Sequence, residues 1–220
     1  MEARYRQDYP GEFVILETKW SQGKKTEKRE WIENPIQNQH LSGRAACISS
    51  NVDFDTFNFR ILESHRGGLL GSKKLQTYGT AKVAHTMRLD FSVDTNYSNL
   101  TPLLDNRYVE NNIVYTTAKN CIKNPGEFYL IPLMPQLSPE ALPLYLASFD
   151  GHQEIYMLGY TNETIGGTSN WIQDVTSVIK AYSGTTFIMV GNEKNMPEEW
   201  LACPNTQNFT YRHFISYCDV

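Results

Sequence analysis

The sequence predicts an α/β protein with a mostly parallel sheet, helices on both faces and an N-terminal β-hairpin. Short apolar runs alternate with helical segments along most of the 220 residues, which is the pattern of repeated βα units. The clearest unit is an apolar helix that ends at Phe149, a turn at Asp150-Gly151-His152 and the buried strand Ile155–Leu158. The alternating stretch from Phe13 to Trp20 supplies the first strand of the hairpin.

The N-terminal elements follow from alternation and turn residues. The hairpin is expected to turn at Gly23-Lys24-Lys25 and to return over Glu27–Ile32. The apolar strand Arg44–Ile48 ends in the polar turn Ser49-Ser50-Asn51, and a helix over about 56–63 follows. A strand, a turn and a helix in this order open a Rossmann-like half-domain.

The remaining elements continue the same alternation. Strands are expected at 74–78, 90–94, 113–117, 127–131, 155–158 and 185–190. Helices are expected at 81–88, 100–104, 138–149, 171–182 and 197–201. Without an internal repeat or a linker, the sequence predicts a single domain, with a hairpin extension (1–40), a core (41–205) and an aromatic tail (206–220) that packs on the body.

Composition is that of a globular protein, with 40% hydrophobic and 20% charged residues. A net charge of −4 argues against nucleic-acid binding as the main task. Lys24, Lys25, Lys28 and Arg29 nevertheless form a local basic cluster, either a solvated loop or a phosphate-binding patch. The four cysteines are widely separated and no export signal opens the chain, so we expect a cytoplasmic protein with reduced thiols.

Four stretches carry a resemblance to a known family: Arg44–Asn51, Leu75–Gly79, Leu89–Asp94 and Leu146–Tyr160, of which the last is the most specific. Together they resemble a group of Rossmann-like sugar-transferring proteins, the small bacterial sialyltransferase-type enzymes and related phage glycosyltransferases. The phrase Glu30–Ile36 also resembles the start of such proteins from T4-like phages. The resemblance implies a nucleotide-sugar donor bound at the carboxyl ends of the strands, in the cytoplasm of an infected bacterial host.

The resemblance also implies which residues bind the donor. They are Ser49, Ser50, Asn51, Tyr78, Gly79, Thr80, Tyr160 and Thr161. Arg66 is a further candidate from its own loop, because it stands beside two glycines that would let the loop close over phosphates, and an ordinary surface loop is the alternative.

Glycosyl transfer also needs a base that takes the proton of the acceptor hydroxyl. Asp94, at the carboxyl end of a short buried strand, is the candidate, and a helix cap is the alternative. His152 precedes a strand, so it is expected at the opposite edge of the sheet in a structural role. Asp53-Phe54-Asp55 has the Asp-x-Asp form of a metal site, but helix capping explains it more simply and we expect no metal there.

Two hypotheses remain. In the first, the chain is a phage glycosyltransferase whose acceptor is hydroxymethylated cytosine in phage DNA, contacted through the basic cluster at 24–29. In the second, it is a non-catalytic phage accessory protein that binds a nucleotide or a host protein. Two departures from the family favour the second. Ser49-Ser50-Asn51 replaces a turn that is usually Gly-x-Gly-Pro-Ser, and Tyr160-Thr161 replaces a tip that usually carries Asp.

Overall fold

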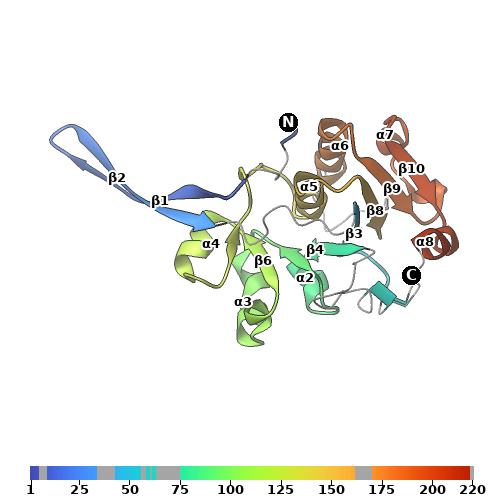
Figure 1. Ribbon diagram of the computed structural model, residues 1–220, viewed down its shortest axis with the longest axis horizontal. Helices are drawn as coiled ribbons and strands as arrows, with labels where there is room; N and C mark the ends of the chain where they lie inside the picture. Colours follow the sequence, from blue (N-terminus) through green and yellow to red (C-terminus); the bar gives the residue numbers. More distant parts are fainter. Residues whose placement is uncertain are drawn as a thin grey trace.

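A parallel sheet forms the body of the molecule, and an antiparallel ribbon projects from it (Figure 1). The computed structural model describes residues 1–4, 9–33, 43–55, 58–59, 61–62, 75–161 and 170–218. Within them, eight strands pair in parallel in the order β10-β9-β8-β3-β4-β5-β6-β7. This arrangement confirms the predicted α/β class and the N-terminal hairpin.

The strands of the described chain are β1 (Gly11–Ser21), β2 (Lys24–Glu33), β3 (Arg44–Ile48), β4 (Gln76–Thr80), β5 (Phe91–Val93), β6 (Ile113–Thr116), β7 (Tyr129–Leu130), β8 (Glu154–Leu158), β9 (Thr186–Val190) and β10 (Thr206–Phe209). The α-helices are α2 (Ala81–Ala84), α3 (Tyr97–Asp105), α4 (Ala118–Lys123), α5 (Ala141–Phe149), α6 (Trp171–Ala181), α7 (Glu198–Leu201) and α8 (Tyr211–Cys218). Two short 3-10 helices are η2 (Tyr108–Glu110) and η3 (Glu193–Asn195).

Most differences from the predicted elements lie at boundaries. The hairpin turns at Gln22 and Gly23, both with positive φ, so Lys24 already belongs to β2. Strand β4 begins later than expected and includes Gly79 and Thr80. Half of the helix expected at 56–63 lies outside the described residues. Of the described half, residues 61–62 are helical.

The course of the chain creates a switch point beside β3. The strands β4 to β7 are added in turn on one side of β3. The chain then returns through α5 to place β8 on the other side, followed by β9 and β10. Residues 44–48 of β3 pair in register with residues 154–158 of β8, so their carboxyl ends finish level. In open α/β sheets, ligands bind at the strand ends where the order reverses in this way.

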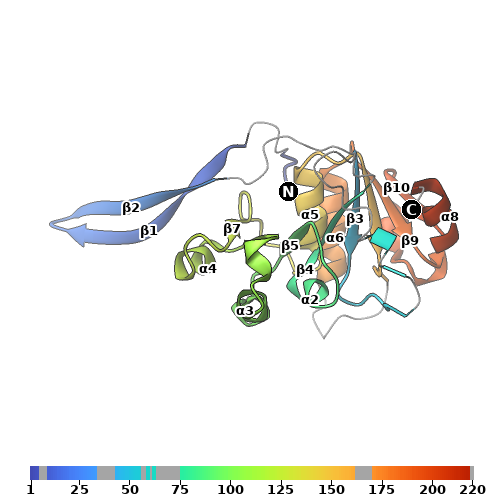
Figure 2. The same ribbon diagram turned by 60° about the horizontal axis from the view of Figure 1, so that its bottom comes forward.

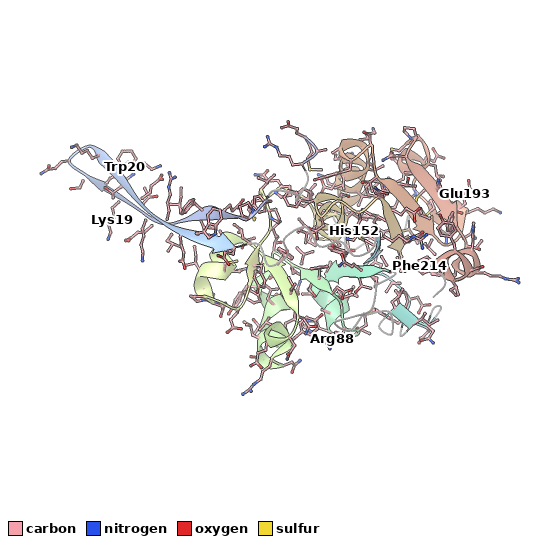
Figure 3. All side chains as sticks on the ribbon, in the orientation of Figure 1. Lys19, Trp20, Arg88, His152, Glu193 and Phe214 are labelled. Carbon is pink, nitrogen blue, oxygen red and sulfur yellow. The ribbon has the colours of Figure 1, made fainter. Side chains whose placement is uncertain are left out.

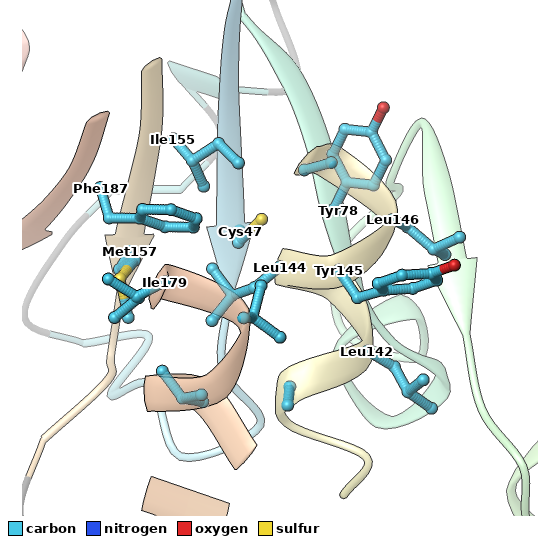
Figure 4. Close-up of a cluster of buried hydrophobic side chains, with 14 of the residues drawn as sticks. Cys47, Tyr78, Leu142, Leu144, Tyr145, Leu146, Ile155, Met157, Ile179 and Phe187 are labelled. Carbon is cyan, nitrogen blue, oxygen red and sulfur yellow. The ribbon is translucent and has the colours of Figure 1, made fainter. Parts of the chain in front are cut away.

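Two helical layers bury the sheet. Residues of α5, α6 and α7 share one core cluster with Ala45 and Cys47 of β3, whereas residues of α2, α3 and α8 share the other with Ala46 and Ile48. This alternation along a single strand is the period of two that a doubly covered strand requires. Figure 4 shows Leu144 of α5 beside Cys47 in the first cluster.

The C-terminal segment completes the sheet. The polar strand β10 pairs with β9, and Phe214 of α8 is fully buried against the ring of Tyr156. The expectation that the aromatic tail packs on the body is therefore confirmed. Among the described residues, no helix is long and apolar enough to cross a membrane.

Candidate functional site at the carboxyl edge of the sheet

Two turns meet where β3 and β8 end. The first is Ser49–Val52 after β3, and the second is Gly159–Thr161 after β8. The backbone N–H of Ser49 donates a hydrogen bond to the carbonyl of Leu158 at 2.9 Å. Gly159 has a φ of +76°, and a Cβ there would lie 2.7 Å from the Cα of Val52. Because only glycine permits this contact, the sequence itself sets how closely the two turns approach.

Glu140 fills the space beneath the two turns. It directly precedes α5, and it is only 4% exposed. Its Oε2 accepts hydrogen bonds from the Ser49 hydroxyl at 3.0 Å and from the Ser50 backbone N–H at 3.1 Å. Its Oε1 accepts a hydrogen bond from the Ser50 hydroxyl. The Tyr160 hydroxyl donates to the backbone carbonyl of Glu140 at 3.0 Å, so this residue joins both turns.

The donors around Glu140 are those that bind an oxyanion. Two hydroxyls and a backbone N–H of Ser49 and Ser50 converge on its carboxylate, and such charge-assisted hydrogen bonds are stronger than neutral ones. A phosphate oxygen of a ligand would use the same donors. Burial, with added contributions from Cys47 and Glu140, raises the pKa of Tyr160 well above its ordinary value, which keeps this hydroxyl a neutral donor.

The neighbouring strand end carries a hydroxyl with unused capacity. Gly79 of β4 pairs with Ile48 of β3, so Thr80 is level with Ser49 at the edge. Thr80 is 2% exposed, and its Oγ1 has no hydrogen-bond partner among the described residues. Buried hydroxyls are nearly always paired with protein or water. Thr80 therefore marks a place on this edge where the described residues supply no hydrogen-bond partner.

Asp94 lies at the end of β5, two strands away from β3. It is 1% exposed and accepts hydrogen bonds from the backbone N–H of Asn96 at 2.8 Å and from the side-chain amide of Asn99 at 3.0 Å. Burial raises the pKa of Asp94 from 3.8, although these hydrogen bonds act in the opposite direction. Its contacts organise the turn into α3, while its raised pKa suits a group that accepts a proton.

The other expected donor-binding residues lie in different surroundings. The Tyr78 hydroxyl donates to Asp150 at 2.6 Å and lies 3.0 Å from Nε2 of His152, inside the core. Gly79 allows close packing, since a Cβ there would lie 2.8 Å from the Leu89 side chain. Thr161 is half-buried at the end of the second turn. Arg66 lies outside the described residues.

The sequence order places His152 as expected, in the turn before β8 and thus at the opposite edge from Glu140. The side chain of Asp53 accepts a hydrogen bond from the backbone N–H of Asp55 at 2.9 Å, within a turn. In the described part of the chain, no group of three or more His, Cys, Asp and Glu side chains is arranged to hold a metal ion. The basic cluster at 24–29 lies on the β1–β2 ribbon, away from the switch point (Figure 1).

The sequence reasoning missed Glu140 as a site residue. Glu140 falls in the range 138–149 that is predicted as a helix, where Ser138 with Glu140 indicates the helix start. No periodicity rule reports the contact between Glu140 and Ser50, because the two residues are 90 positions apart.

A separate cavity of about 390 Å³ lies at the base of the ribbon. It is bounded by residues of β1 and β2 on one side and by α4 and β7 on the other, among them Trp31, Ile122 and Phe128. None of the residues that line it belongs to the turns around Glu140. The cavity and the switch point are therefore distinct features.

No protein-family model matches the chain, and no curated protein matches it. Among solved structures, it is similar to the sialyltransferase CstII from Campylobacter jejuni, in complex with a substrate analogue, cytidine-5'-monophosphate. The two share 12% sequence identity with a TM-score of 0.41, and the match covers 74% of this chain and 86% of that chain.

Proposed function

We propose that the chain is a glycosyltransferase that binds a nucleotide-sugar donor at the switch point between β3 and β8. The observation that carries the proposal is the meeting of two polar turns at the carboxyl ends of these strands, where parallel sheets bind ligands. Ser49, Ser50 and Thr80 would contact the phosphates, and Asn51, Tyr160 and Thr161 would border the same site. Arg66, which lies outside the described residues, is proposed as a further cation for the phosphates.

Asp94 is proposed as the base that accepts the proton of the acceptor hydroxyl. Its raised pKa and its place at a strand end on the same edge support this role. The acceptor that we propose is hydroxymethylated cytosine of phage DNA, in the cytoplasm of an infected bacterial cell. This part of the proposal is supported by the sequence resemblance to phage glycosyltransferases and by the basic cluster of the ribbon.

Glu140 favours a second candidate, a non-catalytic accessory protein on the same scaffold that binds a nucleotide or a host protein. The carboxylate already satisfies the Ser49 and Ser50 donors that a phosphate would need. Two anions do not share these donors, so a donor phosphate binds there only when the Glu140 side chain leaves. An accessory protein that binds a host protein needs no such movement.

Thermal unfolding with a panel of UDP-, GDP- and CMP-sugars, with and without Mn²⁺, separates the two candidates. A ligand that binds the native state raises the Tm by mass action. The enzyme hypothesis expects a rise with one class of donor, a larger rise for Glu140→Ala, and loss of transfer for Asp94→Asn with donor binding retained. A protein that responds to no donor, in either form, supports the accessory function instead.

A further inference from the structure

The outer half of the β1–β2 ribbon, residues 17–29 and here called the arm, stands clear of the body (Figure 2). Every residue of β1 from Glu17 to Ser21 is exposed, whereas Gly11 and Val14 at its base are buried. In the described chain, β1 and β2 pair only with each other, so both edges of the arm are open. Eleven residues of β1 at about 3.3 Å each give the ribbon a length of roughly 36 Å.

The arm has a charge opposite to that of the whole protein. Residues 17–29 carry five cationic side chains and two carboxylates, a net charge of +3, in a chain whose net charge is −4. Glu27 pairs with both Lys25 and Arg29, at 2.6 Å from Arg29. Lys19 pairs with Glu17 at 3.1 Å, and this exposed pair is of the weak kind. Among the described residues, Lys24 and Lys28 have no carboxylate within ion-pair distance. This charge fits a polyanion.

The cations occupy both faces of the arm. Cross-strand partners share a face, and successive residues alternate between faces. Lys25 is the partner of Trp20, so Lys25 and Arg29 lie on the Trp20 face. Lys24 and Lys28 are each one residue before Lys25 and Arg29, so they lie on the other face. Lys19 lies there too, because its partner is Thr26. A membrane surface offers its anionic groups to one side only, whereas a nucleic-acid groove has a row of phosphates on each side.

The width of a two-stranded ribbon favours B-form DNA over an A-form RNA duplex. The major groove of B-form DNA is about 12 Å wide and admits a two-stranded β-ribbon, while the major groove of an A-form RNA duplex is too narrow for side chains to read. Trp20 is 72% exposed and lies with Lys19 near the far end of the arm (Figure 3). An aromatic ring at the tip of a cationic ribbon would contact bases and sugars inside the groove.

We propose that the arm inserts into the major groove of duplex DNA, with the cations of residues 19–29 on the phosphates and Trp20 at the bases. This inference deepens the proposed function and rests on it for one point, that the DNA held by the arm is the acceptor of the sugar. Binding itself requires neither a donor nor the carboxyl edge of the sheet.

The test measures binding of the full chain to a fluorescent DNA duplex by anisotropy, between 50 and 200 mM salt. Two phosphate contacts contribute about 2 to the slope of log K against log salt. The Lys24→Ala/Lys28→Ala variant should lose this amount and bind at least about tenfold more weakly at the lowest salt. The matched control is Lys180→Ala/Lys194→Ala, two exposed lysines of the body, which should bind as the parent does. Quenching of tryptophan emission by the duplex should be lost in Trp20→Phe.

Several results would overturn the proposal. They are the absence of binding to any duplex, equal binding by the arm variant and its control, and tighter binding of an RNA duplex of the same sequence. Adsorption to anionic phospholipid vesicles in place of DNA, or self-association that the arm substitutions abolish, would assign the arm to another partner. The thermal shift with nucleotide sugars is a separate measurement, so failure of DNA binding and failure of the proposed enzyme function are distinguishable.

Discussion

The carboxyl edge of the sheet and the arm place similar side chains in opposite surroundings. At the edge, Ser49, Ser50 and Tyr160 donate hydrogen bonds to Glu140. The ring of Tyr160 is buried in the core. On the arm, a tryptophan and five cations face solvent. A ligand at the edge must displace internal hydrogen bonds, whereas a partner of the arm displaces only water and weak surface ion pairs. The edge therefore favours a selective ligand, and the arm favours contact by charge.

The largest expected difference between the two regions comes from two tryptophans. Trp200 is fully buried, donates to the carbonyl of Ile172 at 3.2 Å and packs on Tyr160. Trp200→Ala should lower the free energy of unfolding by about 3–5 kcal/mol, because it empties a large buried site. Trp20→Ala should change it by less than about 0.5 kcal/mol. Urea unfolding followed by circular dichroism measures both, and a large cost for Trp20→Ala would mean that the arm packs on the body.

A smaller effect is expected from the glycine that brings the two turns together. Gly159→Ala forces alanine into a left-handed conformation, at roughly 1–2 kcal/mol, and adds a clash with Val52 that costs about 1–3 kcal/mol more. Gly126 is the matched control, because its φ is +85° and a Cβ there meets nothing within 4 Å. Gly126→Ala should show the conformational cost alone. Equal loss of stability in the two variants, measured by urea unfolding, would remove the argument that the turns are in close contact.

The smallest of these effects concerns the pH dependence of the edge. Burial raises the pKa of Asp94 above 3.8, so the folded protein holds this proton more tightly than the unfolded chain. Its contribution to stability is complete below pH 3.8 and is lost as the pH rises through the raised pKa. The stability of the parent relative to Asp94→Asn should therefore fall as the pH rises. Urea unfolding midpoints of the parent and of Asp94→Asn, measured from acid to neutral pH, test this expectation. A difference in midpoint between the two proteins that does not change with pH would contradict it.

Much of the fold was predictable, because most strands are apolar runs whose period differs from that of the helices. The missed strand β10 shows the limit. It reads Thr-Gln-Asn-Phe, and only Phe209 at its end is buried. An edge strand needs one neighbour and little apolar surface, so it leaves a weak pattern in the sequence. The helix α4 was missed for a similar reason, as its six residues have only two buried positions.

The candidate site was predictable in part. Parallel strands end at a common edge, so a fold prediction alone brings Ser49–Asn51 close to Tyr160 and Thr161 once β3 and β8 are neighbours. The direction of a side chain within a strand is harder to assign. Tyr78 is grouped with Gly79 and Thr80 in the prediction, yet its hydroxyl donates to Asp150 at the C-terminal end of α5. Glu140 could not be placed at all without the tertiary path that carries the chain back beneath β3.

The pairing of the arm has a consequence for its dynamics. In the described chain, β1 and β2 each form ladder hydrogen bonds with one strand only, namely each other, whereas β3 pairs with both β4 and β8. Local unfolding of the outer arm thus breaks no contact of the sheet, and its free energy is independent of the global stability. Amide hydrogen exchange should be fast and insensitive to denaturant in the arm while β3 remains protected. We expect a protease that cuts between Lys24 and Lys25 to leave the body folded, because the sheet does not need the arm for its stability.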